Sequence, residues 1–180
     1  MGISDLSTHS GRAFGRAAAS VALAATCALT ASAAWLAGAA IAQPAADAVA
    51  PNPRLRQVEI QAGMHLIRAE VAADGATRSK GLMMRPRLGA NEGMLFVFAD
   101  KAGHCFWMKN TLIPLSIAFL DDDGTIVNIE DMQPHKEDSH CPVRPIRYAL
   151  EMDQGWFAKR GIKPGAKLSQ SQLFRPAAGN

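Results

Sequence analysis

The sequence lacks any long run of like charge. Its 180 residues carry 19 Lys and Arg against 16 Asp and Glu, a formal net charge of +3, and the two signs are mixed along the chain. We therefore expect no basic patch of the kind that binds nucleic acid. Gly-x-Ser-x-Gly and His-Glu-x-x-His strings are also missing, so the hydrolase classes that they mark are not indicated. The length allows one domain, or one domain and a tail, and excludes a multidomain enzyme.

Charged residues are also missing from residues 17–42, a run of mostly Ala, Leu and Val. Arg12 and Arg16 precede this run, and residues 40–42 (Ala-Ile-Ala) end it with a small-x-small pattern. A positive start, an apolar middle and a small-residue end predict a secretory signal peptide over residues 1–42. The alternative is an uncleaved membrane anchor, since 26 uncharged residues are long enough to span a bilayer.

The rest of the chain divides by composition. Residues 43–54 contain three prolines among Ala and Asn, which predicts a flexible linker. Residues 55–174 then form the folded domain, and residues 175–180 form a short tail. We expect this domain to be periplasmic or exported, with no membrane span after signal cleavage, or to lie outside the inner membrane if the N-terminus stays as an anchor. The oligomeric state is open.

Cysteine is scarce. Of three cysteines, Cys27 lies in the predicted signal peptide, which leaves Cys105 and Cys141 in a compartment that tolerates disulfides. A disulfide between them closes a loop of 35 residues and stabilises the fold by about 3–4 kcal/mol. Each cysteine follows a histidine (His104 and His140), so a metal site is a second alternative and a reactive thiol a third. The metal site is disfavoured because adjacent side chains on a strand point to opposite faces.

Most of the predicted domain shows the alternating pattern of β-strands. Ile67, Ala69 and Val71 alternate with Arg68 and Glu70, which is typical of a half-buried strand. We expect strands at residues 58–60, 64–71, 93–98, 105–109, 115–120, 125–129, 147–152 and 166–168.

Two short helices and one tight turn interrupt this pattern. Asp74 is a candidate N-cap for a helix over residues 74–84, and Asp153 for a helix through Arg160. The Asp-Gly pair that ends residues 121–124 predicts a hairpin turn, whereas the spacing of an EF-hand calcium loop is missing. The fold class expected is therefore mainly β: a single compact β-sandwich, jelly-roll-like or small-barrel domain with one or two short helices.

Three groups of sequence strings stand out. The first group is Gly-Leu-Met-Met-Arg at 81–85 with Glu-Gly-Met-Leu-Phe-Val-Phe at 92–98. The second is Phe-Trp-Met-Lys-Asn-Thr at 106–111 with Ile-Pro-Leu at 113–115. The third is Tyr-Ala-Leu-Glu-Met at 148–152, followed by Gly-Trp at 155–156 and Gly-Ile-Lys-Pro-Gly at 161–165. In order and spacing they resemble a bacterial and archaeal family, the domain of unknown function 192. The resemblance implies a compact, mainly β fold, and many members look exported or membrane-anchored. It implies no established activity. The family usually has Asp after Pro-Leu, where this chain has Ser116.

Polar and aromatic side chains of these strings are candidates for a ligand groove, in which indoles supply flat apolar walls and cations supply charge. The candidates are Arg85, Trp107, Lys109, Asn110, Glu151 and Trp156. A structural ion pair is an equal alternative for Arg85, Lys109 and Glu151. Phe106 and Met108 are expected in the core.

No cofactor or metal is expected. The methionines show no Met-x-Met or Met-x-x-Met spacing, so they indicate core packing rather than copper binding. The polar residues His135, Glu137, Asp138 and His140 indicate a solvated loop, with weak metal binding as the alternative. The function predicted is an exported accessory or binding module for a small polar or anionic envelope ligand. The alternative is an enzyme that acts on a small molecule or an envelope polymer in the same groove.

Overall fold

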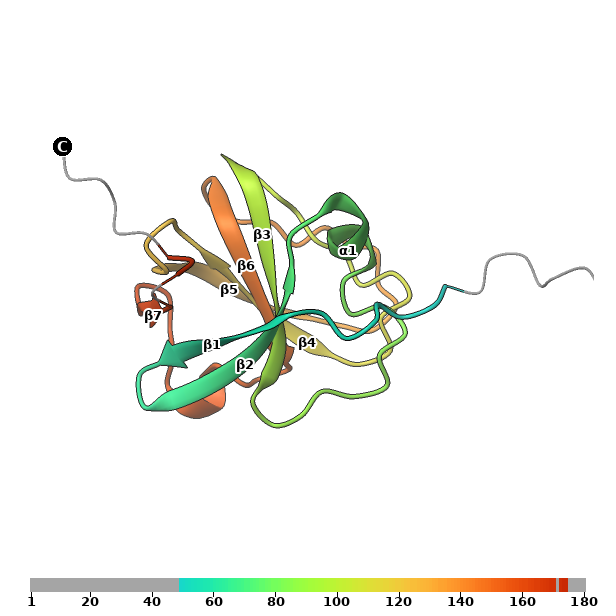
Figure 1. The fold of residues 1–180 in the computed structure, drawn as a ribbon, viewed down its shortest axis with the longest axis horizontal. Coiled ribbons are helices and arrows are strands. Elements are labelled where there is room, and N and C mark those ends of the chain that lie inside the picture. The colour runs from blue at the N-terminus through green and yellow to red at the C-terminus, as the bar shows by residue number, and fades with distance from the viewer. Residues whose placement is uncertain (1–48, 171, 175–180) are drawn as a thin grey trace, which may run out of the picture. The chain divides into compact units, whose positions relative to one another are not determined.

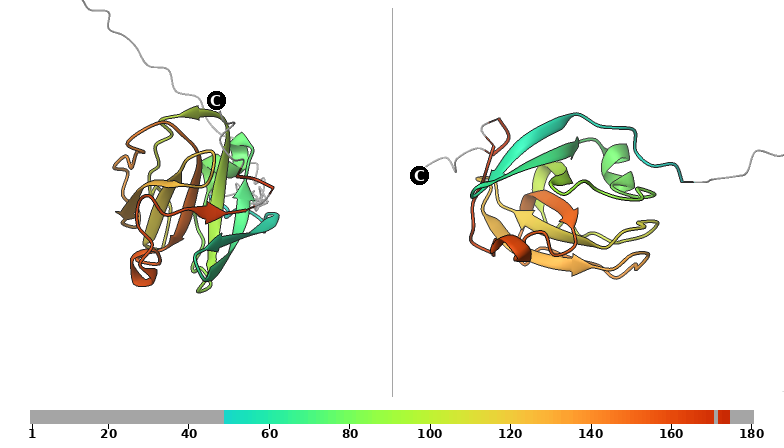
Figure 2. Two further views of the ribbon diagram at one scale, coloured as in Figure 1. Left: turned by 90° about the vertical axis from the view of Figure 1, so that its left-hand side faces the viewer. Right: turned by 90° about the horizontal axis from the view of Figure 1, so that it is seen from below.

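The chain folds into a mainly β domain, shown from three directions in Figures 1 and 2. The structure, a computed structural model, describes residues 49–170 and 172–174. The predicted signal peptide at 1–42 and the predicted tail at 175–180 lie outside the described residues. Within the described part of the chain, no helix has the length and apolar character needed to cross a membrane.

Seven strands in the described part of the chain form one sheet. They are β1 (Gln57–Ala62), β2 (His65–Ala72), β3 (Glu92–Ala102), β4 (Leu115–Leu120), β5 (Ile126–Met132), β6 (Ile146–Asp153) and β7 (Leu168–Ser169), in the spatial order β5-β4-β6-β3-β2-β1-β7. Neighbouring strands are antiparallel except β2 and β3, which are parallel. The mainly β fold predicted from the sequence is confirmed, as one curled sheet.

Residues 165–169 bring the two edges of the sheet together. β7 pairs with β1, where Leu168 lies opposite Ala62. Just before β7, the carbonyl of Ala166 accepts a hydrogen bond from the backbone N–H of Ile126 in β5 at 2.9 Å. The sheet therefore curls round until β1 and β2 lie opposite β4 and β5 (Figure 2), which is closer to the small barrel than to two stacked sheets.

Alternation along the strands gives the sheet two buried faces. On β6, Tyr148, Leu150 and Met152 belong to a core inside the curl, whereas Ala149 belongs to a second core on the outer face. The outer core also contains Leu82 and Met108 and, partly buried, Leu88, Phe106 and Ile113. Residues 81–90 and 104–114 therefore cover the outer face, and the functional site described below lies beneath this cover.

One helix, α1 (Gly75–Lys80), follows β2 and is shorter than predicted. Asp74 is its N-cap, as predicted, and its Oδ1 accepts a hydrogen bond from the Thr77 N–H at 2.9 Å. The helix ends at Gly81, whose φ of +49° other residues rarely adopt. The Asn52 amide, in the predicted linker, donates to the carbonyls of Thr77 and Gly81 at 3.0 and 2.9 Å. Ordered contacts of the domain therefore begin before residue 55.

Two further elements differ from the prediction. Residues 105–109 alternate in burial as a strand does, but they form only one bridge, between Phe106 and His140. The helix predicted from Asp153 to Arg160 is wrong, because Asp153 pairs with β4 as the last residue of β6. Only a 3-10 turn, η1 (Ala158–Arg160), follows it.

Candidate functional site

A cavity of about 270 Å³ lies on the outer face of the sheet. One wall is α1 with the turn after it, which contributes Arg78 and Lys80, and the opposite wall is residues 105–107, which contribute Trp107. Phe98 of β3 and Glu151 of β6 line the cavity from the sheet. Segments far apart in the sequence therefore meet here because all of them pack on the same face of β3 and β6.

Glu151 is the buried carboxyl group of this cavity, which is also lined by the buried Thr111. Only 4% of Glu151 is exposed, and its neighbours in register on β3 and β4 are Met94 and Ile117. Among the described residues, no side chain or backbone group forms a hydrogen bond or ion pair with its carboxyl group. Burial raises the pKa of Glu151 to about 8. The carboxyl group is therefore mostly protonated at pH 7 and can both donate and accept a hydrogen bond.

Aromatic rings form much of the wall. Trp107 is 49% exposed, and the Lys109 Nζ lies 5.2 Å from the centroid of its ring. The Phe98 ring stacks on His104 at 3.6 Å, and the Arg78 guanidinium lies 5.2 Å from its centroid. These rings give the cavity flat apolar surfaces beside the carboxyl group, a combination typical of ligand sites.

The wall at residues 105–107 is attached to the rest of the domain in two ways. Cys105, which lines the cavity, forms a disulfide with Cys141. The neighbouring residues Phe106 and His140 exchange two backbone hydrogen bonds, both of 2.8 Å. Of the three alternatives for the cysteines, the structure therefore has the disulfide, in which neither sulfur is a thiolate that could bind a metal or attack a substrate.

Two of the six predicted ligand residues, Trp107 and Glu151, come together in the cavity. Arg85 does not line it, because its Nη2 donates to Glu70 Oε2 at 3.0 Å and to the Pro53 carbonyl at 3.2 Å. Arg54 donates to the other oxygen of Glu70 at 2.9 Å. Arg85 therefore belongs to a structural ion pair, which the sequence left as an alternative.

The remaining three candidates also lie outside the cavity lining. Lys109 reaches it only through its contact with Trp107. Asn110 has a φ of +55°, and its carbonyl accepts a hydrogen bond from the Met84 N–H at 2.9 Å, so its backbone joins two loops. Trp156 is 2% exposed and belongs to the core inside the curl, on the other face of the sheet.

Sequence analysis missed Arg78, Lys80, Phe98 and Thr111 as lining residues. No local pattern connects α1 with residues 105–111, because they meet only when both pack on the sheet. One signal was present: Glu151 is the charged residue within the otherwise uncharged residues 148–152, and a carboxyl group in such a run is rarely buried without a partner.

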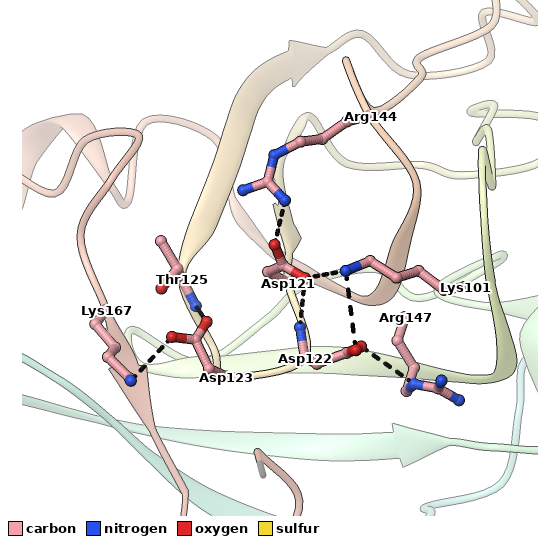
Figure 3. Close-up of polar contacts among 8 residues, drawn as sticks. All are labelled: Lys101, Asp121, Asp122, Asp123, Thr125, Arg144, Arg147 and Lys167. Atoms are coloured by element: carbon pink, nitrogen blue, oxygen red, sulfur yellow. Dashed lines mark hydrogen bonds and ion pairs between the residues drawn. The ribbon is translucent and has the colours of Figure 1, made fainter. Parts of the chain in front are cut away.

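A second polar cluster lies at the turn between β4 and β5 (Figure 3). The predicted hairpin is confirmed, since β4 and β5 pair on either side of residues 121–124. Each carboxylate of the turn pairs with at least one cation. Asp121 pairs with Arg144 and Asp122 with Arg147, Lys101 is shared between these two, and Asp123 pairs with Lys167. These pairs neutralise the three negative charges and tie the turn to three other segments.

The ion pairs also change the acidity of the turn. Burial alone would raise the pKa of Asp121, but hydrogen bonds from Arg144 and Lys101 outweigh it and hold that pKa well below its usual range. A hydrogen bond from Lys167 is the main cause that lowers the pKa of Asp123. Asp121 and Asp123 therefore keep their charges, and their ion pairs, in moderately acidic solution.

The polar residues predicted at 135–140 form no compact cluster. His140 Nδ1 lies 2.8 Å from Glu130 Oε2, and Glu137 lies 3.9 Å from the Lys109 ammonium group. In the described ranges, no three His, Cys, Asp or Glu side chains are placed to hold a metal ion together.

Comparisons with known proteins give the chain its family. The family described as Uncharacterized ACR, the domain of unknown function 192, matches residues 57–170, whereas no curated protein matches the chain. A protein of unknown function from Novosphingobium aromaticivorans DSM 12444 is 37% identical with a TM-score of 0.63, over 67% of this chain and 91% of that chain. A "putative transcription regulator" from Sinorhizobium meliloti 1021 is 35% identical with a TM-score of 0.59, over 63% of this chain and 91% of that one. The chain thus belongs to the family of the domain of unknown function 192.

Proposed function

We propose that this chain is an exported binding module that holds a small polar ligand in the cavity at Glu151. The observation that carries the proposal is the carboxyl group itself, which is 4% exposed, lines a cavity and has no partner among the described residues. Because buried polar groups without a hydrogen-bond partner are rare in native proteins, a ligand that completes the hydrogen bonds of Glu151 is the simplest reason for this one.

The rest of the cavity supports this proposal. Its volume, about 270 Å³, lies near the lower end of the range for small-molecule sites. Trp107 is half exposed at the wall, so a bound molecule can cover its ring and remove apolar surface from water. The ligand expected is a molecule of roughly ten heavy atoms, with one polar group for Glu151 and an apolar face for the ring.

The alternative is an enzyme that uses the same cavity. A carboxyl group with a pKa near 8 is suited to donate a proton at neutral pH. Catalysis also needs a second group that acts on the substrate, such as a nucleophile or a base. Among the described residues that line the cavity, Arg78 and Lys80 are the other ionisable groups, and both are cations at neutral pH. This lining favours binding over catalysis.

The proposal that the protein is exported rests on the signal peptide predicted at residues 1–42. The disulfide supports it, because disulfides persist in oxidising compartments. Cell fractionation of the full-length protein tests it, followed by N-terminal sequencing. We expect a periplasmic product that begins at Gln43. A membrane-bound product that retains residues 1–42 would indicate the anchor instead, and a cytoplasmic full-length product would contradict export.

A thermal-shift screen of sugars, amides, amines, amino acids and carboxylates tests ligand binding. We expect at least one class to raise the melting temperature of the wild-type domain and to lose this effect in Trp107→Ala and Glu151→Gln. Leu66→Ala is the matched control, because Leu66 is 46% exposed and lies outside this cavity. If every compound that stabilises the wild type also stabilises both cavity variants equally, the site lies elsewhere. No stabilisation at millimolar concentrations refutes the proposal.

A further inference from the structure

Building on the proposed function, we infer that the ligand is a small organic ammonium ion with an apolar body, paired with Glu151 and packed against the aromatic wall. An ionised carboxyl group supplies a full negative charge, which an uncharged polar side chain does not.

Glu151 has an environment in which that charge acts strongly. Its neighbours in register, Met94 and Ile117, are apolar, and no described residue supplies a counter-ion. The attraction between opposite charges grows as the effective dielectric constant falls, so an ammonium group reaching this carboxylate gains more than it would at the surface. A bound cation also offsets the free-energy cost of burying an ionised carboxylate that has no hydrogen-bond donor among the described residues.

The aromatic wall provides the second, independent observation. Two rings that line the cavity already hold cations of the protein, with the Arg78 guanidinium 5.2 Å from Phe98 and the Lys109 ammonium 5.2 Å from Trp107. Both distances lie within the range of about 6 Å in which a cation is attracted to a ring. Phe98 is already packed by His104 and Arg78, whereas Trp107 is 49% exposed and keeps ring surface open to a ligand. An ammonium ion with an apolar body therefore suits the Trp107 ring together with the carboxylate.

Two cations of the protein also face the cavity and oppose a positive ligand. From α1, Arg78 and Lys80 line it, whereas β3 and β4 present only apolar side chains in register with Glu151. The Arg78 guanidinium is held by the carbonyl of Val97 at 3.0 Å and by that of Ala73. Both cations are half-buried, so solvent screens them more than it screens Glu151. While Glu151 is protonated these two cations disfavour a positive ligand, so an ammonium ion is expected to bind once Glu151 is ionised.

Ammonium binding requires the ionised form of Glu151 and therefore depends on pH. With a pKa of about 8, about one carboxyl group in ten is ionised at pH 7 and about nine in ten at pH 9. Affinity for an amine that stays protonated should therefore rise about tenfold between these pH values, with release of a proton on binding. A neutral ligand that accepts a hydrogen bond from the protonated carboxyl group shows the opposite trend and weakens about tenfold.

Three probes with one shared phenylethyl body test the inference: phenethylamine, phenylethanol and phenylpropionate. Their affinities for the wild-type domain are measured by calorimetric titration at pH 7 and pH 9. We expect the amine to bind most tightly at pH 9, with about a tenfold preference over the alcohol, and to lose this preference at pH 7, where most of Glu151 is protonated. Glu151→Gln should remove both this preference and the rise with pH. Glu70→Gln changes another buried carboxylate, which lies outside the cavity, and should keep both once circular dichroism shows that it is folded.

The outcomes separate the inference from the proposed function. If phenylethanol or phenylpropionate binds in the cavity at least as tightly as phenethylamine at pH 9, where Glu151 is mostly ionised, the ammonium inference is overturned and the binding function stands. The inference is also overturned if the amine binds without the rise between pH 7 and pH 9, or if Glu151→Gln keeps the preference. If none of the probes and none of the compounds in the wider screen binds, the proposed function fails as well.

Discussion

Replacing Glu151 by Gln should make the domain more resistant to unfolding in alkaline solution. In the folded state the pKa of Glu151 is raised to about 8, from 4.5 for an unperturbed glutamate. Below pH 4.5 the carboxyl group is protonated in both states and has no effect. As the pH rises above 4.5 the unfolded chain ionises first, so the wild type loses stability until the pH passes 8, and then the loss levels off.

The size of the effect follows from this shift. Each unit between the two pKa values corresponds to about 1.4 kcal/mol. The wild type should therefore lose about 3 kcal/mol by pH 7 and about 5 kcal/mol by pH 9 through this one group. The Gln variant has no proton to lose. Relative to the wild type, its free energy of unfolding should rise by about 4 kcal/mol between pH 5 and pH 9.

Urea unfolding of both proteins at five pH values from 5 to 9, followed by circular dichroism, measures this difference. Other ionisable groups titrate in both proteins, so their contributions cancel in the comparison. A constant cost of burying the Gln amide moves all five differences equally and leaves the slope unchanged. Glu70→Gln is the control, because Glu70 is similarly buried but paired with Arg54 and Arg85. Its loss of these pairs should destabilise the domain.

The reasoning is refuted if the difference between Glu151→Gln and the wild type stays constant from pH 5 to pH 9. Such a result means that the carboxyl group ionises as easily in the folded domain as in the unfolded chain. The cavity would then be far more polar than its apolar neighbours indicate, and the pH dependence expected for ligand binding would fall with it.

Further predictions concern stability. Changing both Cys105 and Cys141 to Ser should lower the free energy of unfolding by about 4 kcal/mol, measured in urea, and reductant should lower the wild type to the same value. Asn52→Ala removes two hydrogen bonds at the end of α1 and should lower the free energy of unfolding by about 1–3 kcal/mol. A melting temperature equal to that of the wild type would show that residue 52 does not contribute to the folded domain. A Cβ at residue 93 would overlap β6, so Gly93→Ala should destabilise by about 3 kcal/mol in urea, and wild-type stability would contradict the packing. Asp121→Asn should make the free energy of unfolding fall less steeply as the solution is acidified. In the wild type, the ion pairs that lower the pKa of Asp121 stabilise the fold fully above pH 3.8, the pKa of an unperturbed aspartate, and this stabilisation is lost as the pH falls toward the pKa of Asp121 in the folded state. A parallel pH curve for the variant would contradict this.

The fold could be predicted from the sequence where the pattern is local. β4 has the bounds expected for residues 115–120, and the Asp-Gly pair marks the turn that follows, because alternation and turn chemistry act over a few residues. Residues 105–109 show the limit of this reasoning. Their side chains alternate between buried and exposed, but only one bridge forms there, since a strand also needs a partner along its whole length.

The candidate site could be predicted only in part. Trp107 and Glu151 carried a visible signal, an aromatic residue beside polar groups and a carboxyl group within an apolar strand. Trp156 carried the same kind of signal, but it lies on the other face of the sheet. Which face a residue occupies after a turn depends on how the sheet curls, and no short window of sequence contains that information.

The contacts of residues 165–169 have a consequence for the order of folding. These residues join β1, the first strand of the domain, to β5, so the ring of hydrogen bonds is completed by nearly the last segment of the chain. Closure of this kind links residues about 100 positions apart, and such contacts form slowly because a long loop must be ordered first. During synthesis the open sheet therefore keeps two unpaired edges until its final strand arrives.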